Sequence, residues 1–470
     1  MADALLQVIH RAVAAGDDPT EAILVYGDWL QSRGDVHGEL IALSCGAAAT
    51  ADEPSQNRLH AQWKRRLSEW EVALFGVRPA HLGVSYSIER GFVDALRING
   101  KGQVAADTLA DLVARDICSL VREVDFFYTS WTHGDRPITP RLGLDDCLRA
   151  LAPCARLHTL RVRGCDLGHA EPALLTQLSA LRSLALQHCY KPDDERAAAW
   201  LDAVPAIEQL DLLYSASGPP VYRRLAVLDR LTRLGIDVPD NAISQIRDCL
   251  LAVPRLDRLA LRFEGDWAAL NLPRVRDALG RHRTVDLHLD PIEDLQLTQR
   301  EYRWAAETPG LRCLHLTQMR PTQAELTALA AAQQLKELWL EQIASDSATL
   351  LGALPALPGL GTLRVEHSGD SAPCRVDYLE RLPELRQFHL RCQLLAAGAL
   401  DPIAQCSQLA QLELLVGQAR GRHIDLGPLR GHPALARLSV RFVGQLPSVA
   451  VMSRVARLPR GQLVGADALA

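Results

Sequence analysis

Apolar residues recur along most of this chain in one short pattern, apolar-x-x-apolar-x-apolar. The pattern starts at residues 157, 181, 207, 231, 256, 284, 311, 335, 360, 385, 409 and 435, so successive starts lie 24 to 28 residues apart. Its last two apolar positions alternate with polar ones, as at Leu160 and Val162, which is typical of a strand with one buried face. A second apolar segment with helical spacing follows, for example residues 324–331. The chain is therefore predicted to repeat one strand and one helix.

One such unit cannot bury its own apolar face, so neighbouring units must stack on one another. The pattern resembles the leucine-rich repeat, Leu-x-x-Leu-x-Leu-x-x-Asn/Cys, and two copies keep its last position at Cys165 and Cys189. Two irregular copies, which begin at Val93 and Val121, precede the regular repeats. A degenerate copy begins at Thr284. The predicted fold class is α/β, a right-handed leucine-rich-repeat solenoid with a parallel concave sheet and helices on the convex side.

A different pattern occupies residues 3–48, which are predicted to form three short helices. Leu5, Val8 and Ile9 share a helical face. The run Asp18-Pro19-Thr20-Glu21 is a helix start, with an N-cap acid and proline at the first helical position. The second helix is expected to stop at Gly34, where glycine can take a left-handed conformation.

Residues 24–43 read LVYGDWLQSRGDVHGELIAL. This stretch resembles the bacterial repeat-companion domain, whose core is similar to L-V-Y-A-D-W-L-E-E-R-G-D-x-R-G-E-F-I-x-L, with departures at Gly27, His37 and Leu40. Residues 90–93 (RGFV) resemble the lead into the first repeat strand of such proteins. The resemblance implies a leucine-rich-repeat protein with an N-terminal helical module of unassigned role. Five polar and aromatic residues of the module are expected to fix its packing and to cap the solenoid, or else to form a binding site of their own: Tyr26, Asp28, Trp29, Arg33 and Asp35.

These patterns predict four parts. Residues 1–48 form the helical repeat-companion-like module, and residues 49–89 a connecting segment. Residues 90–443 form the solenoid, and residues 444–470 a C-terminal cap or tail.

Composition narrows the possible environments and partners. The formal charge of −5 gives no field strong enough to recruit nucleic acid or an anionic membrane. The number of cysteines, eleven, is odd, and no two of them form a Cys-x-x-Cys motif. We therefore expect buried free thiols and a reducing compartment. The first residues lack the apolar core of a signal peptide. A cytoplasmic location is therefore predicted.

The motifs of common enzyme classes are missing from the sequence. It contains no Gly-x-x-x-x-Gly-Lys phosphate loop, no Gly-x-Gly-x-x-Gly, no His-Glu-x-x-His and no Gly-x-Ser-x-Gly. No cysteine has aspartate two positions on, unlike the catalytic Cys-x-Asp of bacterial leucine-rich-repeat ubiquitin ligases. We expect no enzymatic activity and no cofactor or metal.

The informative side chains are those between the motif leucines, because they face the concave surface. Strand spacing should place His288, His315, Trp339 and Arg364 in one column, and the same alignment puts Ala260 beside His288. Trp339 on an open strand face is unusual, and Trp and Arg dominate protein interfaces. A solvated sheet with incidental aromatics remains an alternative, whereas a metal site is disfavoured because His389 lies three strands from His315. The residues predicted to bind a partner are His288, His315, Trp339, Glu341, Arg364, Glu366, His389 and Arg391.

Three functions are compatible with this pattern. The first is a scaffold whose concave face binds a protein partner. The second is a structural or spacer module of a larger assembly that makes contact through its N-terminal helices. The third, a nucleic-acid reader, is disfavoured because Arg, Asp and Glu alternate on the concave face, whereas phosphate binding needs a stripe of one sign.

Overall fold

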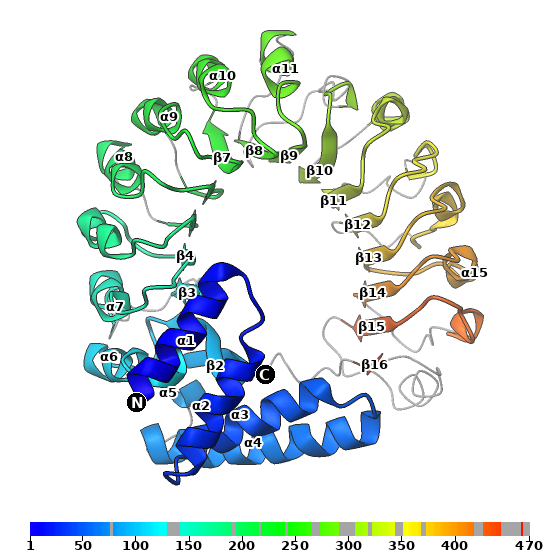
Figure 1. Ribbon diagram of the computed structural model, residues 1–470. Helices are drawn as coiled ribbons and strands as arrows, with labels where there is room; N and C mark the ends of the chain where they lie inside the picture. The colour runs from blue at the N-terminus through cyan, green and yellow to red at the C-terminus, as the bar shows by residue number, and fades with distance from the viewer. Residues whose placement is uncertain are drawn as a thin grey trace. The chain divides into compact units, whose positions relative to one another are not determined.

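The strand and helix of the predicted repeat alternate along the parts of the chain that the computed structural model describes. These are residues 1–75, 79–128, 142–189, 194–215, 218–239, 243–264, 273–290, 306–317, 322–343, 351–367, 373–417, 426–442 and 462–463. The chain forms two units, Met1–Leu231 (unit 1) and Thr232–Ala470 (unit 2). Within each unit the strands lie side by side in chain order (Figure 1).

Unit 1 begins with the three predicted helices, α1 (Ala2–Ala15), α2 (Thr20–Gln31) and α3 (Val36–Ala49). Their apolar faces share a core with Phe92 of the first repeat strands. As predicted, Gly34 after α2 is left-handed, with a φ of 74°. The start of α2 differs in one detail: Pro19 precedes the first helical residue, and the Asp18 carboxylate accepts hydrogen bonds from the hydroxyl (2.6 Å) and the backbone N–H (3.1 Å) of Thr20.

Four of the five conspicuous residues of this module fix its packing. The buried Tyr26 hydroxyl donates to Asp116 (2.8 Å), and its ring stacks on Trp29 at 5.9 Å between centroids. The Arg33 guanidinium lies over Trp29, and Asp35 caps α3 by accepting from the backbone N–H of His37. Asp28 is exposed. Gly27, one of the departures from the family pattern, faces Ile41, whose Cγ2 would lie 2.9 Å from a Cβ at this position.

Residues 49–89 contain more regular structure than a connection requires. The 23-residue helix α4 (Glu53–Phe75) packs beside α3, where Arg66 pairs with Glu39 at 2.8 Å, and a short helix α5 (Pro79–Leu82) precedes the first strand. The four-part division of the chain remains a prediction. Its last part, residues 444–470, lies outside the described residues except for β16 (Gln462–Leu463).

The sheet of unit 1 opens with an antiparallel hairpin and continues as parallel strands. Its strands are β1 (Val84–Glu89), β2 (Phe92–Asn99), β3 (Glu123–Phe127), β4 (Thr159–Arg163), β5 (Ser183–Gln187) and β6 (Gln209–Leu212). The intervening helices are α6 (Ala106–Val113), η1 (Asp116–Cys118), α7 (Leu144–Leu151), η2 (Pro172–Gln177), α8 (Asp194–Asp202) and α9 (Pro219–Leu225). The motif residues Leu160, Leu184 and Leu210 pair across strands and are at most 2% exposed, which confirms the predicted core of this unit.

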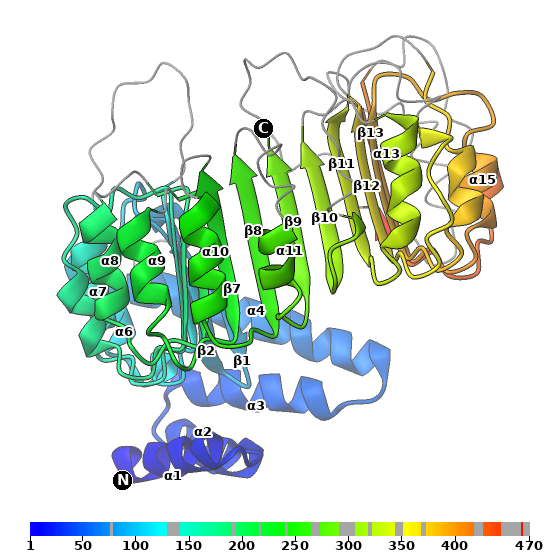
Figure 2. The ribbon, with the colours of Figure 1, turned by 90° about the horizontal axis from the view of Figure 1, so that it is seen from above.

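Unit 2 continues the same architecture with parallel strands (Figure 2). They are β7 (Arg233–Pro239), β8 (Arg258–Glu264), β9 (Val285–Asp290), β10 (Leu311–Thr317), β11 (Glu337–Ile343), β12 (Thr362–His367), β13 (Gln387–Cys392), β14 (Gln411–Val416) and β15 (Arg437–Phe442). One face carries α10 (Ile243–Ala252), α11 (Pro273–Leu279), α13 (Gln323–Ala328), α15 (Leu400–Gln405) and the 3-10 turns η5 (Leu329–Ala331), η6 (Asp377–Arg381) and η7 (Gly427–Leu429). The face of the strands that points away from these helices is the concave face.

One strand register differs from the prediction. β9 pairs with β8 so that Leu287 lies beside Leu261 and His288 beside Arg262, whereas the repeat alignment placed His288 beside Ala260. Val285, Leu287 and Leu289 are all buried, so a two-residue shift keeps every apolar side chain on the core face. The degenerate repeat therefore left its register undetermined.

All eleven cysteines are free and buried. Cys165 and Cys189 occupy adjacent repeat turns, where the Cys189 thiol donates to the carbonyl of Val162. Burial raises the pKa of the Cys189 thiol to about 11 and that of Cys118 to about 12, so these groups are protonated at neutral pH.

Leu338→Ala should lower the free energy of unfolding by about 2–5 kcal/mol, because Leu338 is fully buried between neighbouring strands. Glu337→Ala changes the adjacent, half-buried residue on the opposite face and should cost no more than about 1 kcal/mol. Urea unfolding followed by circular dichroism measures both. Equal losses would show that the strand register is wrong by one residue.

Maleimide labelling should be slow for the folded protein and should modify eleven thiols after unfolding without reductant, since the thiols are buried and protonated. Mass spectrometry of protein purified anaerobically counts the labels. A Cys165–Cys189 disulfide in such a preparation would contradict this expectation and the predicted reducing location.

Candidate partner-binding surface on unit 2

The eight residues predicted to bind a partner lie on five consecutive strands of unit 2, β9 to β13. Five of them are paired strand to strand and form what we call the central row: His288, His315, Trp339, Arg364 and His389. Two positions further along the strands is the second row: Glu341, Glu366 and Arg391. The expected column of side chains is therefore present, and its binding of a partner remains a prediction.

The first two members of the central row are histidines in contact. Their Nδ1 atoms are 3.3 Å apart, and the rings meet edge to face with centroids 5.2 Å apart. Burial, followed by the positive charge of neighbouring groups, lowers the pKa of His288 to about 4, so this ring is neutral at neutral pH. When both rings are neutral, Nδ1–H of His288 can donate to Nδ1 of His315. Nε2–H of His315 then points to Glu341.

Glu341 connects three strands through its carboxylate. Oε2 accepts from Nε2 of His315 on β10 (3.1 Å), and Oε1 accepts from Nε of Arg364 on β12 (2.9 Å). The hydrogen bond from His315 holds the pKa of Glu341 below its usual value, although burial opposes this effect. Both carboxylate oxygens are engaged by charge-assisted or imidazole donors, so the side chains of these strands are held in fixed positions.

The Trp339 indole is clamped between its neighbours in the row. The His315 ring lies 5.1 Å from it on one side, and the Arg364 guanidinium lies 5.3 Å from its centre on the other. Its Nε1–H is buried and has no acceptor within the described part of the chain. The sequence predicts an openly exposed indole here, but the structure leaves it only partly exposed because both neighbours cover it.

Two further pairs of side chains lie on this surface. Arg391 pairs with Glu366 at 2.5 Å, and His389 with Glu413 at 3.0 Å. The Arg391 side chain is 53% exposed against 14% for Glu366, and Arg364 is 42% exposed against 19% for Glu341. The guanidinium groups therefore cover the carboxylates and face the solvent.

The row extends beyond the predicted residues in both directions. Arg262 pairs with Asp237 at 3.6 Å and precedes His288, and Glu413 follows His389. Arg262 was missed because the repeat alignment placed Ala260 there. The alternation of Val285, Leu287 and Leu289 was the sequence signal that allowed this second register.

These groups lack the geometry of a catalytic triad. Thr317 Oγ1 lies 3.2 Å from Nε2 of His315, the same ring nitrogen that contacts Glu341, whereas a triad needs the nucleophile and the acid on opposite nitrogens. Within the described ranges, no cluster of three or more His, Cys, Asp or Glu side chains is arranged to hold a metal ion.

The strand order and the repeat define the protein class: this chain is an α/β leucine-rich-repeat solenoid with a small all-α N-terminal module. None of the helices in its described segments combines the length and apolar character needed to span a bilayer. No protein-family model matches the chain, and no curated protein is found to be similar to it.

Many solved structures align with the chain, including the following two. An internalin (inlF) from Listeria monocytogenes aligns with 14% identity and a TM-score of 0.30, covering 78% of this chain and 85% of that one. A chain of the yeast Rad7 and Elc1 complex aligns with 16% identity and a TM-score of 0.45, covering 68% of this chain and 87% of that one.

His288 should make stability depend on pH between about 6.5 and about 4. Its pKa is 6.5 when unfolded and about 4 when folded, so below pH 6.5 the unfolded chain binds a proton that the folded chain does not. Wild-type stability should therefore fall with decreasing pH, by up to about 1.4 kcal/mol per pH unit for this group. His288→Gln should have a shallower slope in urea unfolding at pH 7.5, 6 and 5. An unchanged slope would show that His288 is accessible to protons in the folded state.

Proposed function

We propose that the protein is a non-catalytic scaffold that binds a protein partner on the concave face of unit 2, centred on Trp339. The observation that carries this proposal is the partly exposed indole, which is clamped between His315 and Arg364. An aromatic side chain held in place before binding loses little conformational entropy when a partner covers it. Trp and Arg in such positions are the commonest energetic anchors of protein interfaces.

The exposed charge favours a partner surface that carries carboxylates beside an apolar group. Arg364 on β12 and Arg391 on β13 lie on the same side of the indole, and their guanidinium groups are more exposed than the carboxylates with which they pair. A carboxylate of the partner can add to these guanidinium groups, because Arg364 uses only Nε for Glu341. Nucleic acid fits this surface poorly, since basic and acidic side chains are mixed on it, whereas phosphate binding needs a stripe of one sign.

Location and origin form part of the same proposal. Eleven free, buried thiols suit a reducing compartment, which supports a cytoplasmic protein. The packing of Tyr26, Trp29, Arg33 and Asp35 supports assigning the N-terminal helices to the bacterial repeat-companion type.

A second candidate function has one observation in its favour. Leu24 and Val25 on α2, and Val8 on α1, are 40–50% exposed although they are large and apolar. Exposed apolar side chains on the helical module suit docking in a larger assembly, with the repeats as a spacer.

Trp339→Ala should weaken partner binding by about 2 kcal/mol or more, and Trp339→Ala with Arg364→Ala should abolish it. Wild-type and variant full-length proteins are used to capture partners from the native host, followed by calorimetry with the purified partner. Arg437→Ala, an exposed arginine on β15 of the same sheet, is the matched control and should bind normally.

Leu24→Ser with Val25→Ser in the full-length protein separates the two functions. If this change removes the partner while the Trp339/Arg364 double variant retains it, the spacer function is correct and the concave-face proposal is wrong. Thermal unfolding of every variant excludes loss of the fold as the cause.

A further inference from the structure

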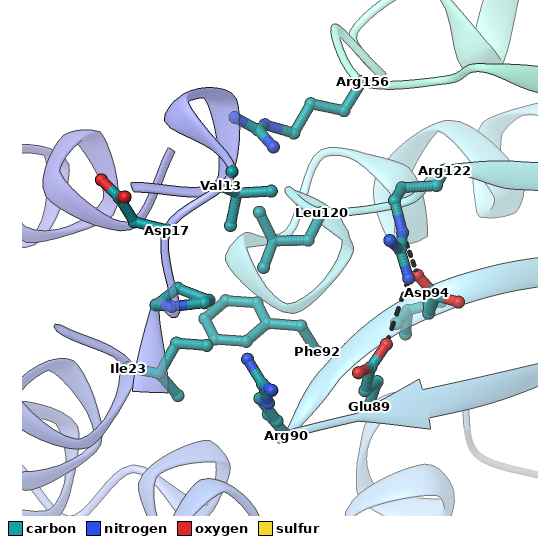
Figure 3. Close-up of a pocket in the computed structure, with 13 residues that line it drawn as sticks. Val13, Asp17, Ile23, Glu89, Arg90, Phe92, Asp94, Leu120, Arg122 and Arg156 are labelled. Carbon is teal, nitrogen blue, oxygen red and sulfur yellow. Dashed lines mark hydrogen bonds and ion pairs between the residues drawn. The ribbon is translucent and has the colours of Figure 1, made fainter. Parts of the chain in front are cut away.

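Unit 1 contains a cavity of about 210 Å³ between the helical module and the first repeats. It lies between the end of α1, the start of α2, the hairpin turn of β1 and β2, and the segments that lead into β3 and β4 (Figure 3). Val13, Ile23, Phe92 and Leu120 give it an apolar lining. Ligand pockets for drug-sized molecules usually exceed about 300 Å³, whereas an engineered apolar cavity of about 150 Å³ holds benzene. This cavity therefore suits one apolar group of about the size of an amino-acid side chain.

Two of the three arginines that line the cavity have carboxylate partners. Arg122 pairs with Asp94 at 2.6 Å and with Glu89 at 3.1 Å, as Figure 3 shows. Arg90 pairs with Asp18 at 2.9 Å, and Asp18 is 71% exposed. Asp17, the other acid of the lining, is exposed and its carboxylate points away from Phe92 and Leu120.

Arg156 is different, because among the described residues no carboxylate pairs with it. Its guanidinium donates to the backbone carbonyl of His10 at the neighbouring helix α1. Burial, with the nearby charge of Arg122, lowers the pKa of Arg156, which shows that its positive charge is poorly compensated. A partly buried guanidinium retains several donors that an anion can use.

Arg90 adds a second sign of a specialised site. It occupies the hairpin turn with a φ of 51°, followed by Gly91 with a φ of 88°. Two-residue turns with both residues at positive φ favour Asn, Asp or Gly at the first position, so arginine is strained there. Gly91 cannot be replaced easily either, since a Cβ would lie 2.4 Å from Cγ1 of Ile41. The turn thus holds the Arg90 side chain at the edge of the cavity, on the side opposite Arg156 (Figure 3).

We propose that this cavity binds a small apolar carboxylic acid, with the apolar group against Phe92 and Leu120 and the carboxylate on Arg156. The same chemistry is present in a free acid and in the C-terminal residue of a polypeptide with an apolar side chain. The site lies wholly in unit 1 and does not depend on the proposed function of unit 2.

N-acetyl-L-leucine is the probe, because it carries one carboxylate, one branched apolar side chain and no ammonium group. Titration into the full-length protein, followed by ligand-detected NMR, should give a dissociation constant on the order of 1 mM or lower. N-acetyl-L-leucinamide, which is neutral, and L-leucinamide, which is cationic, should bind at least about tenfold more weakly because they cannot pair with Arg156. Equal or tighter binding of either amide would overturn the proposal.

Two variants test the two halves of the site. Arg156→Gln should weaken binding of N-acetyl-L-leucine about tenfold or more, whereas Arg149→Gln, an exposed arginine of α7 paired with Asp146, should have no effect. Val13→Phe fills the cavity from α1 without changing charge and should abolish binding. If Arg156→Gln loosens α1 and lowers the melting temperature, Val13→Phe still tests whether the acid binds in this cavity. Retained binding in Val13→Phe would show that the acid binds elsewhere.

The source of the acid is distinguished with a short peptide ending in leucine and with its C-terminal amide. Tighter binding of the free-acid peptide than of N-acetyl-L-leucine identifies a polypeptide terminus, and weaker binding identifies a free acid. The Trp339→Ala/Arg364→Ala variant should bind N-acetyl-L-leucine normally, so failure of this proposal and failure of the concave-face proposal give different results.

Discussion

Every repeat of this protein has an apolar face that it cannot bury alone, and this constraint determines most of the structure. Leu160, Leu184 and Leu338 are almost inaccessible only because a neighbouring strand covers each side. Parallel strands in register put equivalent leucines beside one another and leave the intervening side chains on the concave face. The packing of the apolar residues therefore also determines which polar side chains lie on the concave face.

The same spacing explains the character of the central row. Side chains on adjacent strands are about 4.8 Å apart, close enough for direct hydrogen bonds and stacking. Glu341 joins His315 to Arg364, and these two groups enclose Trp339. The result is a surface of paired side chains on which the guanidinium groups of Arg364 and Arg391 are more exposed than their carboxylate partners.

The N-terminal helices cover the apolar face of the first repeat strands. The first repeat strands have no earlier repeat to cover them, and Phe92 is buried instead against Ile23 and Tyr26 of the helices. The cavity beside Phe92 and Leu120 lies where the helices and the first repeats meet within unit 1. Among the described residues Arg156, which lines this cavity, donates to the backbone carbonyl of His10 and has no carboxylate partner, and the proposed anion site rests on this.

The sequence by itself determined the repeat, the strand and helix alternation, the buried leucines and the column from His288 to Arg364, because regular spacing converts directly into position when repeats stack. It also indicated the helix stop at Gly34 and the free cysteines. It did not determine the register of β9, since Val285, Leu287 and Leu289 allow two alignments that both keep the apolar side chains on the core face. Nor did it show that Trp339 is clamped or that Arg156 lacks a carboxylate partner among the described residues. Those properties depend on side-chain conformations and on contacts between residues such as His10 and Arg156, which lie far apart in sequence, so only the tertiary structure decided them.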